Sequence, residues 1–328
     1  IFARRGSKEE FVYKVSGVRR FMKSAIVTGC TGAVGIALIE ELLRENWYVI
    51  AVSRRASARM SAIPKHKNIE IVECNLDEME QLPQIAGREC DVFYHLAWDG
   101  TYGEDRMDCI RQNRNVEYTL QAVYAAKKLG CRVFIGAGSQ SEFGHVDGVL
   151  TPELVCNPDN PYGAAKLSAG HNSRILCKQL GIRHNWCRIL SLYGPYDGKY
   201  TMVMSIIQSL LKGEKPACTL GEQIWDYIYS KDSARAFRLV AEHGKDGKVY
   251  CIGSGKAKKL REYIEVIRDC INPDLAIGFG EREYFPNQVM HLEADISELK
   301  QDTGFEIQYS FEDGIKETIE WCKENYLR

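Results

Sequence analysis

The sequence lacks long hydrophobic runs, and neither charge is in excess. Its 43 Lys and Arg residues nearly balance its 44 Asp and Glu residues, so the formal net charge is -1. A nucleic-acid-binding surface usually needs a marked excess of basic residues, and a membrane span needs about 20 consecutive apolar residues. We therefore expect no nucleic-acid partner and no membrane partner.

The sequence also lacks a metal-binding cysteine pattern. Its twelve cysteines are scattered, with no Cys-x-x-Cys pair and no His/Cys cluster at ligand spacing. We expect no zinc or other metal site, and we expect reduced thiols in a cytoplasmic protein. With 45% hydrophobic residues over 328 positions, the chain is long enough for one large core and an additional lobe.

The first 21 residues form a basic segment without the apolar core of a secretory signal. We expect this segment to be a disordered N-terminal extension that lies outside the fold.

Strand-like and helix-like segments then alternate along the chain. This alternation predicts an α/β protein, with a Rossmann-type doubly wound parallel sheet that has helices on both faces and binds ligands at the carboxyl ends of its strands. The expected strands are residues 25–28, 48–53, 69–73, 91–96, 132–137 and 185–190.

The segment from Thr28 to Gly35 has the form of a pyrophosphate-binding turn. It follows a short apolar run and precedes an apolar-periodic stretch, so it predicts strand, glycine turn and helix. Gly29 permits a tight turn, Gly32 lets the backbone approach phosphates, and Gly35 lets the helix pack closely on the strand. Unpaired N–H groups at the helix start would then face the anion. Taken alone, such a turn is weak evidence.

A second segment, Asn160 to Lys166, favours redox chemistry on a nicotinamide cofactor. Asn160 can cap a helix with Pro161 in its first turn, which places Tyr162 and Lys166 four residues apart on one face. A tyrosine hydroxyl has a pKa of about 10, and lowering that pKa to near neutrality needs about 4 kcal/mol. Lys166 and an oxidised nicotinamide ring are the expected sources. By itself the spacing favours a packed tyrosine and a solvated lysine, but the glycine turn reverses that preference.

With these motifs in order, the chain resembles an extended short-chain dehydrogenase/reductase of the NAD(P)-dependent epimerase/dehydratase family, which acts on nucleotide sugars. The resemblance runs from about residue 23 to the C-terminus. The segments that carry it are Thr28 to Gly35, His95-Leu96-Ala97, Asn115 to Thr119, Ser139 with Phe143-Gly144, Tyr162 with Lys166, Arg188 with Tyr193-Gly194-Pro195, Trp225 to Tyr229, and Ala294-Asp295-Ile296.

The resemblance implies a catalytic set of Ser139, Tyr162 and Lys166. Tyr162 would act as acid or base, Lys166 would bind the cofactor ribose and tune the tyrosine, and Ser139 would hydrogen-bond the substrate oxygen. Ser141 is a weaker alternative to Ser139. The cofactor-binding residues that it implies are Gly29, Thr31, Gly32, Ala33, Val34, Gly35, Ser53, Arg54, Asn75, Leu76, Leu96, Ala97, Tyr162 and Lys166.

The family's architecture implies three parts for this chain. Residues 1–21 are the extension, and residues 22–194 form an NAD(P)-binding Rossmann domain to which residues 223–252 return. Residues 195–222 and 253–328 form a smaller C-terminal substrate-binding lobe. A strand at 248–252 is expected to rejoin the sheet, helices are expected at 202–212 and 233–243, and a strand is expected near 224–227. Residues 259–271, 294–303 and 311–325 are expected to belong to the lobe.

The end of the second expected strand favours NADP(H). An acidic residue there would bond the adenosine ribose of NAD, whereas the 2′-phosphate of NADP prefers a cation. This chain has Ser53 and Arg54, which can hydrogen-bond and clamp a phosphate. NAD(H) stays an alternative, because Arg54 and Arg55 can also be solvated loop charges.

Departures from the family pattern bear on the reaction. The family's 4,6-dehydratases follow the catalytic threonine with an Asp-Glu pair that handles water elimination, where this chain has Gln140-Ser141. Its epimerases commonly have an arginine where this chain has Trp225, and Ser191 replaces a usual asparagine. Charge for the substrate diphosphate must then come from elsewhere, with Arg282 as the expected source.

The expected substrate-binding residues come from four parts of the chain. Trp98 either stacks on the sugar or packs as a core aromatic residue under the cofactor, and Gln140 can bond sugar hydroxyls. The full set is Trp98, Gln140, Ser141, Ser191 and Arg282.

We therefore expect an NADP(H)-dependent nucleotide-sugar oxidoreductase that reduces a 4-keto-(6-deoxy)sugar nucleotide by Ser-Tyr-Lys hydride and proton transfer. The alternative is a nucleotide-sugar 4-epimerase, which uses the same residues and keeps its NAD(P) tightly bound. A third hypothesis is a non-catalytic NADP-binding protein, against which the intact Tyr162 and Lys166 argue. The family also implies a homodimer, formed through the helices that carry Asn115 and Tyr162.

Overall fold

A seven-stranded parallel sheet forms the centre of the protein, whose computed structural model describes residues 12–15, 18–21 and 23–326. The strand order is β14-β9-β7-β6-β3-β4-β5, which confirms the predicted α/β fold and the return of residues 248–252 to the sheet. The strands are β3 (Ser24–Thr28), β4 (Tyr48–Ser53), β5 (Ile69–Glu73), β6 (Val92–His95), β7 (Val133–Ser139), β9 (Arg183–Ile189) and β14 (Val249–Ile252).

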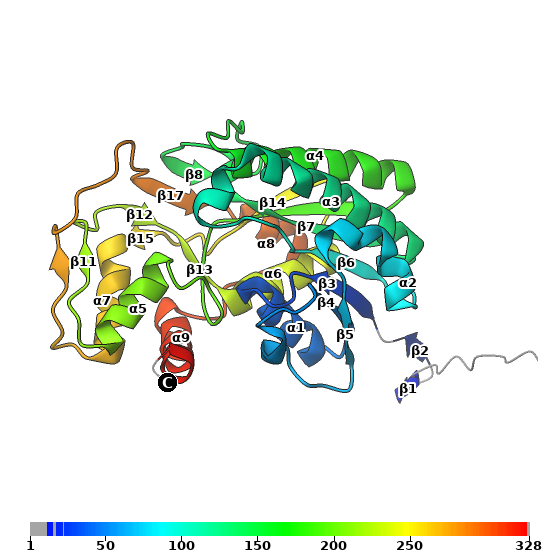
Figure 1. Ribbon diagram of the computed structural model, residues 1–328, viewed down its shortest axis with the longest axis horizontal. Coiled ribbons are helices and arrows are strands. Elements are labelled where there is room, and N and C mark those ends of the chain that lie inside the picture. Colours follow the sequence, from blue (N-terminus) through cyan, green and yellow to red (C-terminus); the bar gives the residue numbers. More distant parts are fainter. Residues whose placement is uncertain (1–11, 16–17, 22, 327–328) are drawn as a thin grey trace, which may run out of the picture.

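Helices cover both faces of this sheet (Figure 1), because successive side chains of a strand point to opposite faces. In β3, Ala25 and Val27 pack on one side, and Ile26 packs on the other. The first face carries α1 (Ala33–Arg44), α6 (Ser230–His243) and α8 (Ser297–Thr303), and the second carries α2 (Leu82–Ala86), α3 (Cys109–Lys128) and α4 (Pro161–Leu180).

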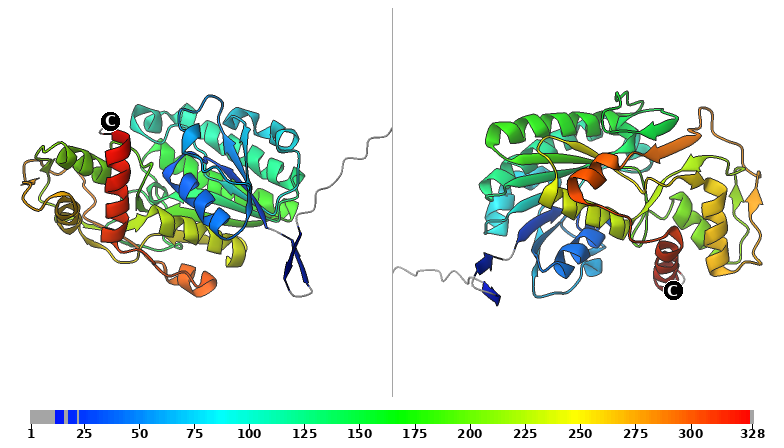
Figure 2. Two further views of the ribbon diagram at one scale, coloured as in Figure 1. Left: turned by 90° about the horizontal axis from the view of Figure 1, so that it is seen from below. Right: turned by 180° about the vertical axis from the view of Figure 1, so that it is seen from behind.

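A smaller lobe lies beside the sheet and is built on three helices (Figure 2). Its core is a separate apolar cluster that includes Met204, Ile267 and Ile319, one from each helix. Two short parallel pairs complete this region, namely β10 with β13 and β11 with β16. The elements are α5 (Met202–Leu211), α7 (Leu260–Ile271), α9 (Phe311–Tyr326), β10 (Ser191–Tyr193), β11 (Ala217–Cys218), β13 (Tyr227–Tyr229) and β16 (Gly278–Phe279).

A four-stranded sheet joins segments that are far apart in the sequence. Its order is β15-β12-β17-β8, so β8 (Gly148–Leu150) pairs with β17 (His291–Ala294), which pairs with β12 (Ile224–Trp225). β15 (Lys258–Lys259) forms its other edge. Short 3-10 helices lie in the loops: η1 (Met60–Ala62), η2 (Leu76–Gln81), η3 (Gly103–Met107) and η4 (Gln140–Glu142).

The C-terminal part of the chain differs from the expected division in one respect. Residues 294–303, expected in the lobe, include α8, which packs on α6 and β14 of the Rossmann domain. The reason is that Leu299 of α8 and the following Phe305 are buried in the core of the main sheet.

The expected extension of residues 1–21 lies largely outside the described residues. Where it is described, β1 (Val12–Val15) and β2 (Val18–Phe21) form an antiparallel pair that joins no other described strand. Within the described ranges, no helix combines the length and the apolar character that crossing a membrane requires.

Candidate active site

The backbone between β3 and α1 is shaped by glycines. Gly29 has a φ of 68°, and a Cβ atom added there would lie 2.7 Å from the Ala97 backbone nitrogen. A Cβ atom on Gly35 would lie 2.2 Å from the Gly29 oxygen, whereas one on Gly32 would have its nearest neighbour at 3.6 Å. No side chain caps the N-terminus of α1. Its first N–H groups are therefore available to an anion.

Thr28 and His95 fix the strand ends beside this turn. The Thr28 hydroxyl accepts hydrogen bonds from the backbone nitrogens of Leu96 (3.2 Å) and Ala97 (3.3 Å), and it lies 3.1 Å from His95 Nδ1. Burial, with a smaller effect of the Lys166 charge, lowers the pKa of His95 to about 3. The imidazole is therefore neutral at pH 7, and the Thr28 hydroxyl that it contacts orders the backbone of Leu96 and Ala97.

Two adjacent arginines follow β4 and have different surroundings. Arg55 forms an ion pair with Glu78 (2.5 Å), and its backbone N–H donates to Asn75 (3.1 Å). Arg54 is exposed, lines the cavity described below and forms no ion pair with the carboxylates that the structure describes. Beside it, the buried Ser53 donates its hydroxyl to the Arg54 carbonyl (3.2 Å).

Tyr162 and Lys166 lie in the first turns of α4, as the sequence predicts. Asn160 caps this helix by accepting a hydrogen bond from the Gly163 nitrogen (2.9 Å). Lys166 is buried, and its Nζ donates to the Ala137 carbonyl (2.6 Å). Burial lowers the pKa of Lys166 to about 7, so this ammonium releases its proton far more readily than an exposed lysine.

The groups that act on the Tyr162 hydroxyl differ from the expectation. Burial raises the pKa of Tyr162, while a hydrogen bond with Ser139 and the charge of Arg106 oppose that rise. The Nζ atom of Lys166, the expected cation, lies 5.8 Å from the Tyr162 ring centroid, whereas Arg106 Cζ lies 4.2 Å from it. The lysine is held at Ala137 instead, so the closer cation over the phenol ring is Arg106.

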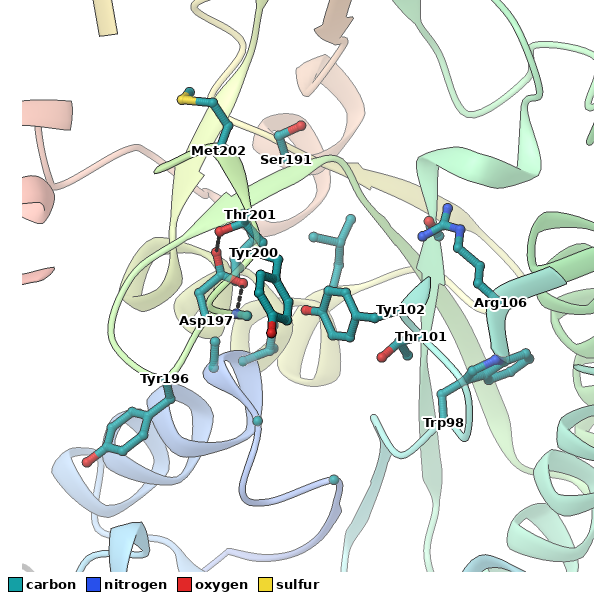
Figure 3. Close-up of a pocket in the computed structure, with 18 of the residues that line it drawn as sticks. Trp98, Thr101, Tyr102, Arg106, Ser191, Tyr196, Asp197, Tyr200, Thr201 and Met202 are labelled. Atoms are coloured by element: carbon teal, nitrogen blue, oxygen red, sulfur yellow. Dashed lines mark hydrogen bonds between the residues drawn. The ribbon is translucent and has the colours of Figure 1, made fainter. Parts of the chain in front are cut away.

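Sequence reasoning misses Arg106 because a single arginine in a polar loop forms no pattern. Its place in η3, in the loop that follows β6, is the available signal, since ligands bind at the carboxyl ends of parallel strands. Figure 3 shows Arg106 next to Trp98 in the cavity wall. The Trp98 indole donates to Gln112 (2.8 Å) and meets the Tyr162 ring edge to face, with centroids 6.0 Å apart.

Ser139 ends β7 and caps η4. Its hydroxyl accepts from the Ser141 nitrogen (3.2 Å), and its own N–H donates to Glu142 (2.8 Å). Glu142 is fully buried and also accepts from Trp186 Nε1 (2.9 Å) and Arg188 Nε (2.7 Å). A buried ion pair, not found from the sequence, therefore fixes the segment that presents Ser139.

The residues expected to bind substrate fall into two groups. Trp98, Ser191 and Arg282 line the cavity, whereas Gln140 and Ser141 are not part of its lining. Gln140 has a buried Oε1 atom with no hydrogen-bond partner among the described residues. Neither Gln140 nor Ser141 is thus placed to contact a molecule in the cavity directly.

The two unusual residues Trp225 and Ser191 contact each other. Trp225 Nε1 donates to Ser191 Oγ (2.7 Å), and both line the cavity. The two replacements therefore act as one neutral unit. Positive charge at this end of the cavity comes from the exposed Arg282, since Lys215, which also lines the cavity, is paired with Glu281.

A cavity of about 1690 Å³ runs from the glycine turn past Tyr162 to the lobe. This volume exceeds the roughly 300–1,000 Å³ of a typical small-molecule pocket, so it can take a cofactor and a substrate together. Unpredicted residues also line it, including Tyr102, Tyr200 and Asp197 (Figure 3). Burial raises the pKa of Asp197 to about 6, and Thr201 donates to its carboxylate (2.9 Å). Within the described ranges, no cluster of His, Cys, Asp or Glu is placed to hold a metal ion.

Comparison with known proteins gives one family and several relatives. The model of the NAD dependent epimerase/dehydratase family matches residues 25–253. The dTDP-glucose 4,6-dehydratase of Salmonella typhimurium is 29% identical over 184 residues, which cover 54% of this chain and 51% of that protein. CDP-abequose synthase of Salmonella muenchen is 23% identical, over 90% of this chain and 97% of that protein. The match thus spans about half the length of the first of these relatives.

Solved structures share the fold. UDP-glucose 4-epimerase of Thermotoga maritima has a TM-score of 0.82 at 22% identity, over 92% of this chain and 99% of that chain. UDP-N-acetylglucosamine 4-epimerase of Methanobrevibacter ruminantium has a TM-score of 0.83 at 24% identity, over 92% of this chain and 99% of that chain. The dTDP-glucose 4,6-dehydratase of Bacillus anthracis, in complex with NAD, has a TM-score of 0.79 at 22% identity, over 93% of this chain and 98% of that chain.

Proposed function

Because the chain belongs to the NAD-dependent epimerase/dehydratase family, we propose that it is an enzyme that oxidises or reduces the sugar of a nucleotide sugar. The observation that carries this proposal is the continuous cavity, which joins the glycine turn and Tyr162 to the lobe. The substrate class is supported by relatives named for dTDP-glucose, CDP-abequose and UDP-glucose.

The residues present fit a nicotinamide dinucleotide. Gly32 has no side chain where the turn lines the cavity, and the uncapped N-terminus of α1 suits a pyrophosphate. When bound, this cofactor supplies or accepts the hydride. We propose that it is held by Gly29, Thr31, Gly32, Ala33, Val34, Gly35, Ser53, Arg54, Asn75, Leu76, Leu96, Ala97, Tyr162 and Lys166, all of which line the cavity.

Tyr162 and Ser139 handle the proton and the developing charge at the sugar carbonyl. In reduction, the Tyr162 hydroxyl donates its proton to the carbonyl oxygen, and Ser139 hydrogen-bonds that oxygen as it becomes negative. In oxidation, the Tyr162 phenolate takes the proton back. Lys166, whose Nζ donates to the Ala137 carbonyl, would hydrogen-bond the cofactor ribose. Trp98 packs against both Tyr162 and Lys166, which excludes water from this group.

We propose NADP(H) as the preferred cofactor because Arg54 lines the cavity without an ion-pair partner among the described carboxylates. Arg54→Ala is expected to weaken NADPH binding about 10- to 100-fold and to leave NADH binding nearly unchanged, since only NADPH carries the 2′-phosphate. Arg55→Ala is the matched control, because Arg55 is already paired with Glu78. Parallel fluorescence titrations measure both affinities, and equal losses for the two cofactors would contradict the preference.

We propose net reduction of a 4-keto-(6-deoxy)sugar nucleotide as the reaction. Dehydration needs carboxylates beside the reacting carbons, and Gln140 and Ser141 supply none. Glu142 is the carboxylate next in sequence, but it is fully buried, is paired with Arg188 and is not part of the cavity lining. The alternative is a 4-epimerase, which the fold of the Thermotoga maritima and Methanobrevibacter ruminantium enzymes supports.

One experiment separates these reactions. The purified, desalted protein is examined by absorbance and fluorescence for retained cofactor and is then given NADPH with a panel of nucleotide-4-keto-6-deoxysugars. Stoichiometric consumption of NADPH is expected for a reductase. Retained cofactor without net consumption of NADPH would contradict the reductase and favour the 4-epimerase. A failure to bind either NADPH or NADH would refute the proposed function.

A further inference from the structure

Arg106 is a cation whose charge the surrounding residues leave uncompensated. It lies in η3 and lines the cavity. Its guanidinium donates to the Ser141 hydroxyl and forms no ion pair with a described carboxylate. Asp99, which precedes η3, and Asp105, which lies in η3 directly before Arg106, are both bound to Arg111, at 2.7 and 2.5 Å. The positive charge of Arg106 is therefore available to the cavity.

The guanidinium lies over the ring of Tyr162. Its Cζ atom is 4.2 Å from the ring centroid, inside the limit of about 6 Å at which a cation is attracted by an aromatic face. A phenolate carries a full negative charge, so a cation in this position stabilises it more than it stabilises the neutral phenol. Tyr162 is buried, and solvent screens this interaction little.

The other charged and titratable groups around Tyr162 act less directly. Lys166, on the same helix, has its Nζ 5.8 Å from the ring centroid. Glu142, in η4, contributes a negative charge that opposes the phenolate. Tyr102, in the segment before η3, is neutral at pH 7, since its pKa is raised above the usual value of a phenol. Arg106 is thus the cation best placed to favour the ionised tyrosine.

We propose that Arg106 is a positioning residue that stabilises the phenolate form of Tyr162, and that Ser141 is its neutral anchor. The inference rests on the proposed role of Tyr162 as acid and base. The hydroxyl of Ser141 holds the guanidinium without neutralising it. A carboxylate in this place would pair with Arg106 and remove its effect on the phenol.

The test titrates the Tyr162 phenol directly, so it needs no substrate. The full chain is labelled with [13Cζ]tyrosine, and the Tyr162 signal among the 17 tyrosines is identified by its loss in Tyr162→Phe. Titrations are recorded for the protein alone and with saturating NADP+ or NAD+. In Arg106→Met the acid dissociation constant of this phenol is expected to fall about tenfold, which corresponds to about 1.4 kcal/mol.

Two further variants separate charge from structure. Arg106→Lys keeps a cation and is expected to recover most of the loss, and Ser141→Glu is expected to reproduce the Arg106→Met titration because it neutralises the guanidinium. Arg114→Met is the matched control, since Arg114 is exposed on α3 and does not line the cavity. A Tyr162 titration that is the same in Arg106→Met and the natural chain would overturn the inference. That result would leave the proposed function standing, because the proposed function is tested separately, by cofactor binding and by the loss of hydride transfer in Tyr162→Phe.

Discussion

Chemically identical neighbours in the cavity wall meet different constraints. Arg54 faces the cavity, whereas Arg55 is occupied by Glu78. Gly29 adopts a left-handed backbone pressed against Ala97, whereas Gly32 has room around it. In each pair, one residue is fixed by its protein neighbours and the other is open to the cavity.

The two glycines give separable effects on substitution. Gly29→Ala is expected to destabilise the fold by about 1–3 kcal/mol, because the added methyl group meets the Ala97 backbone and the φ of 68° is strained for alanine. Gly32→Ala, the matched control, is expected to keep the stability and to weaken cofactor binding, because its methyl group occupies space in the phosphate turn. Urea unfolding and cofactor titration measure the two quantities. Equal stabilities of the two variants would contradict this division.

At this scale the sequence predicts residues that belong to a pattern and misses those that do not. Tyr162 and Lys166 are found because their spacing and the capping Asn160 form a recognisable unit. Arg106 and Glu142 are single charged residues whose partners become neighbours only when distant elements pack. Burial is the main influence on the pKa of the Tyr162 hydroxyl, and a local sequence motif does not reveal how deeply a side chain is buried.

At the scale of elements, β7, η4 and β9 form one unit that presents Ser139. Glu142 of η4 binds Arg188 and Trp186 of β9, and the Trp186 ring lies where a Cβ atom on Gly136 or Gly138 would be. Bulky residues on β9 and glycines on β7 are therefore complementary. The geometry of Ser139 depends on this packing.

Breaking the buried ion pair is expected to be costly. Glu142→Gln leaves Arg188 as an uncompensated buried charge, so the free energy of unfolding should fall by about 3–5 kcal/mol. The double variant Glu142→Gln with Arg188→Met should recover much of that loss, because no charge stays buried. Chemical denaturation measures both, and a double variant less stable than the single one would argue against a dominant role of the charge.

Long elements are predicted well from the sequence, and short ones are not. The six expected strands and the returning strand agree with the structure to within about two residues, because each alternates with a helix-like segment along the chain and so forms part of a recognisable pattern. β8 and β17, which the sequence does not predict, have three and four residues. Their partners lie far along the chain, so only tertiary packing specifies them.

At the scale of the whole molecule, the helices α3 and α4 lie side by side (Figure 1). Each of them has exposed apolar side chains. Ile110 and Tyr124 of α3 and Ile175 of α4 are 69%, 50% and 54% exposed. Ile110 and Tyr124 lie fourteen residues apart, about four helical turns, so they share one face. We propose that a second copy of the chain covers this surface.

Light scattering tests this proposal. The natural chain is expected to have the mass of two copies, and the double variant Ile110→Glu with Ile175→Glu is expected to have the mass of one, because burying two carboxylates opposes association. Val155→Glu is the control, since Val155 is 83% exposed and lies outside both helices. A natural chain that has the mass of one copy would exclude the dimer.

The pairing of β8 with β17 also sets an order of events during synthesis on the ribosome. Leu150 of β8 is synthesised about 140 residues before its partner in β17. At typical elongation rates of roughly 5–20 residues per second, β8 therefore lacks its partner strand for about 7 to 28 s. The core of the lobe forms later still, because it includes side chains from α9, the last helix to be synthesised. The glycine turn and its sheet can thus take shape on the nascent chain before the opposite wall of the cavity exists.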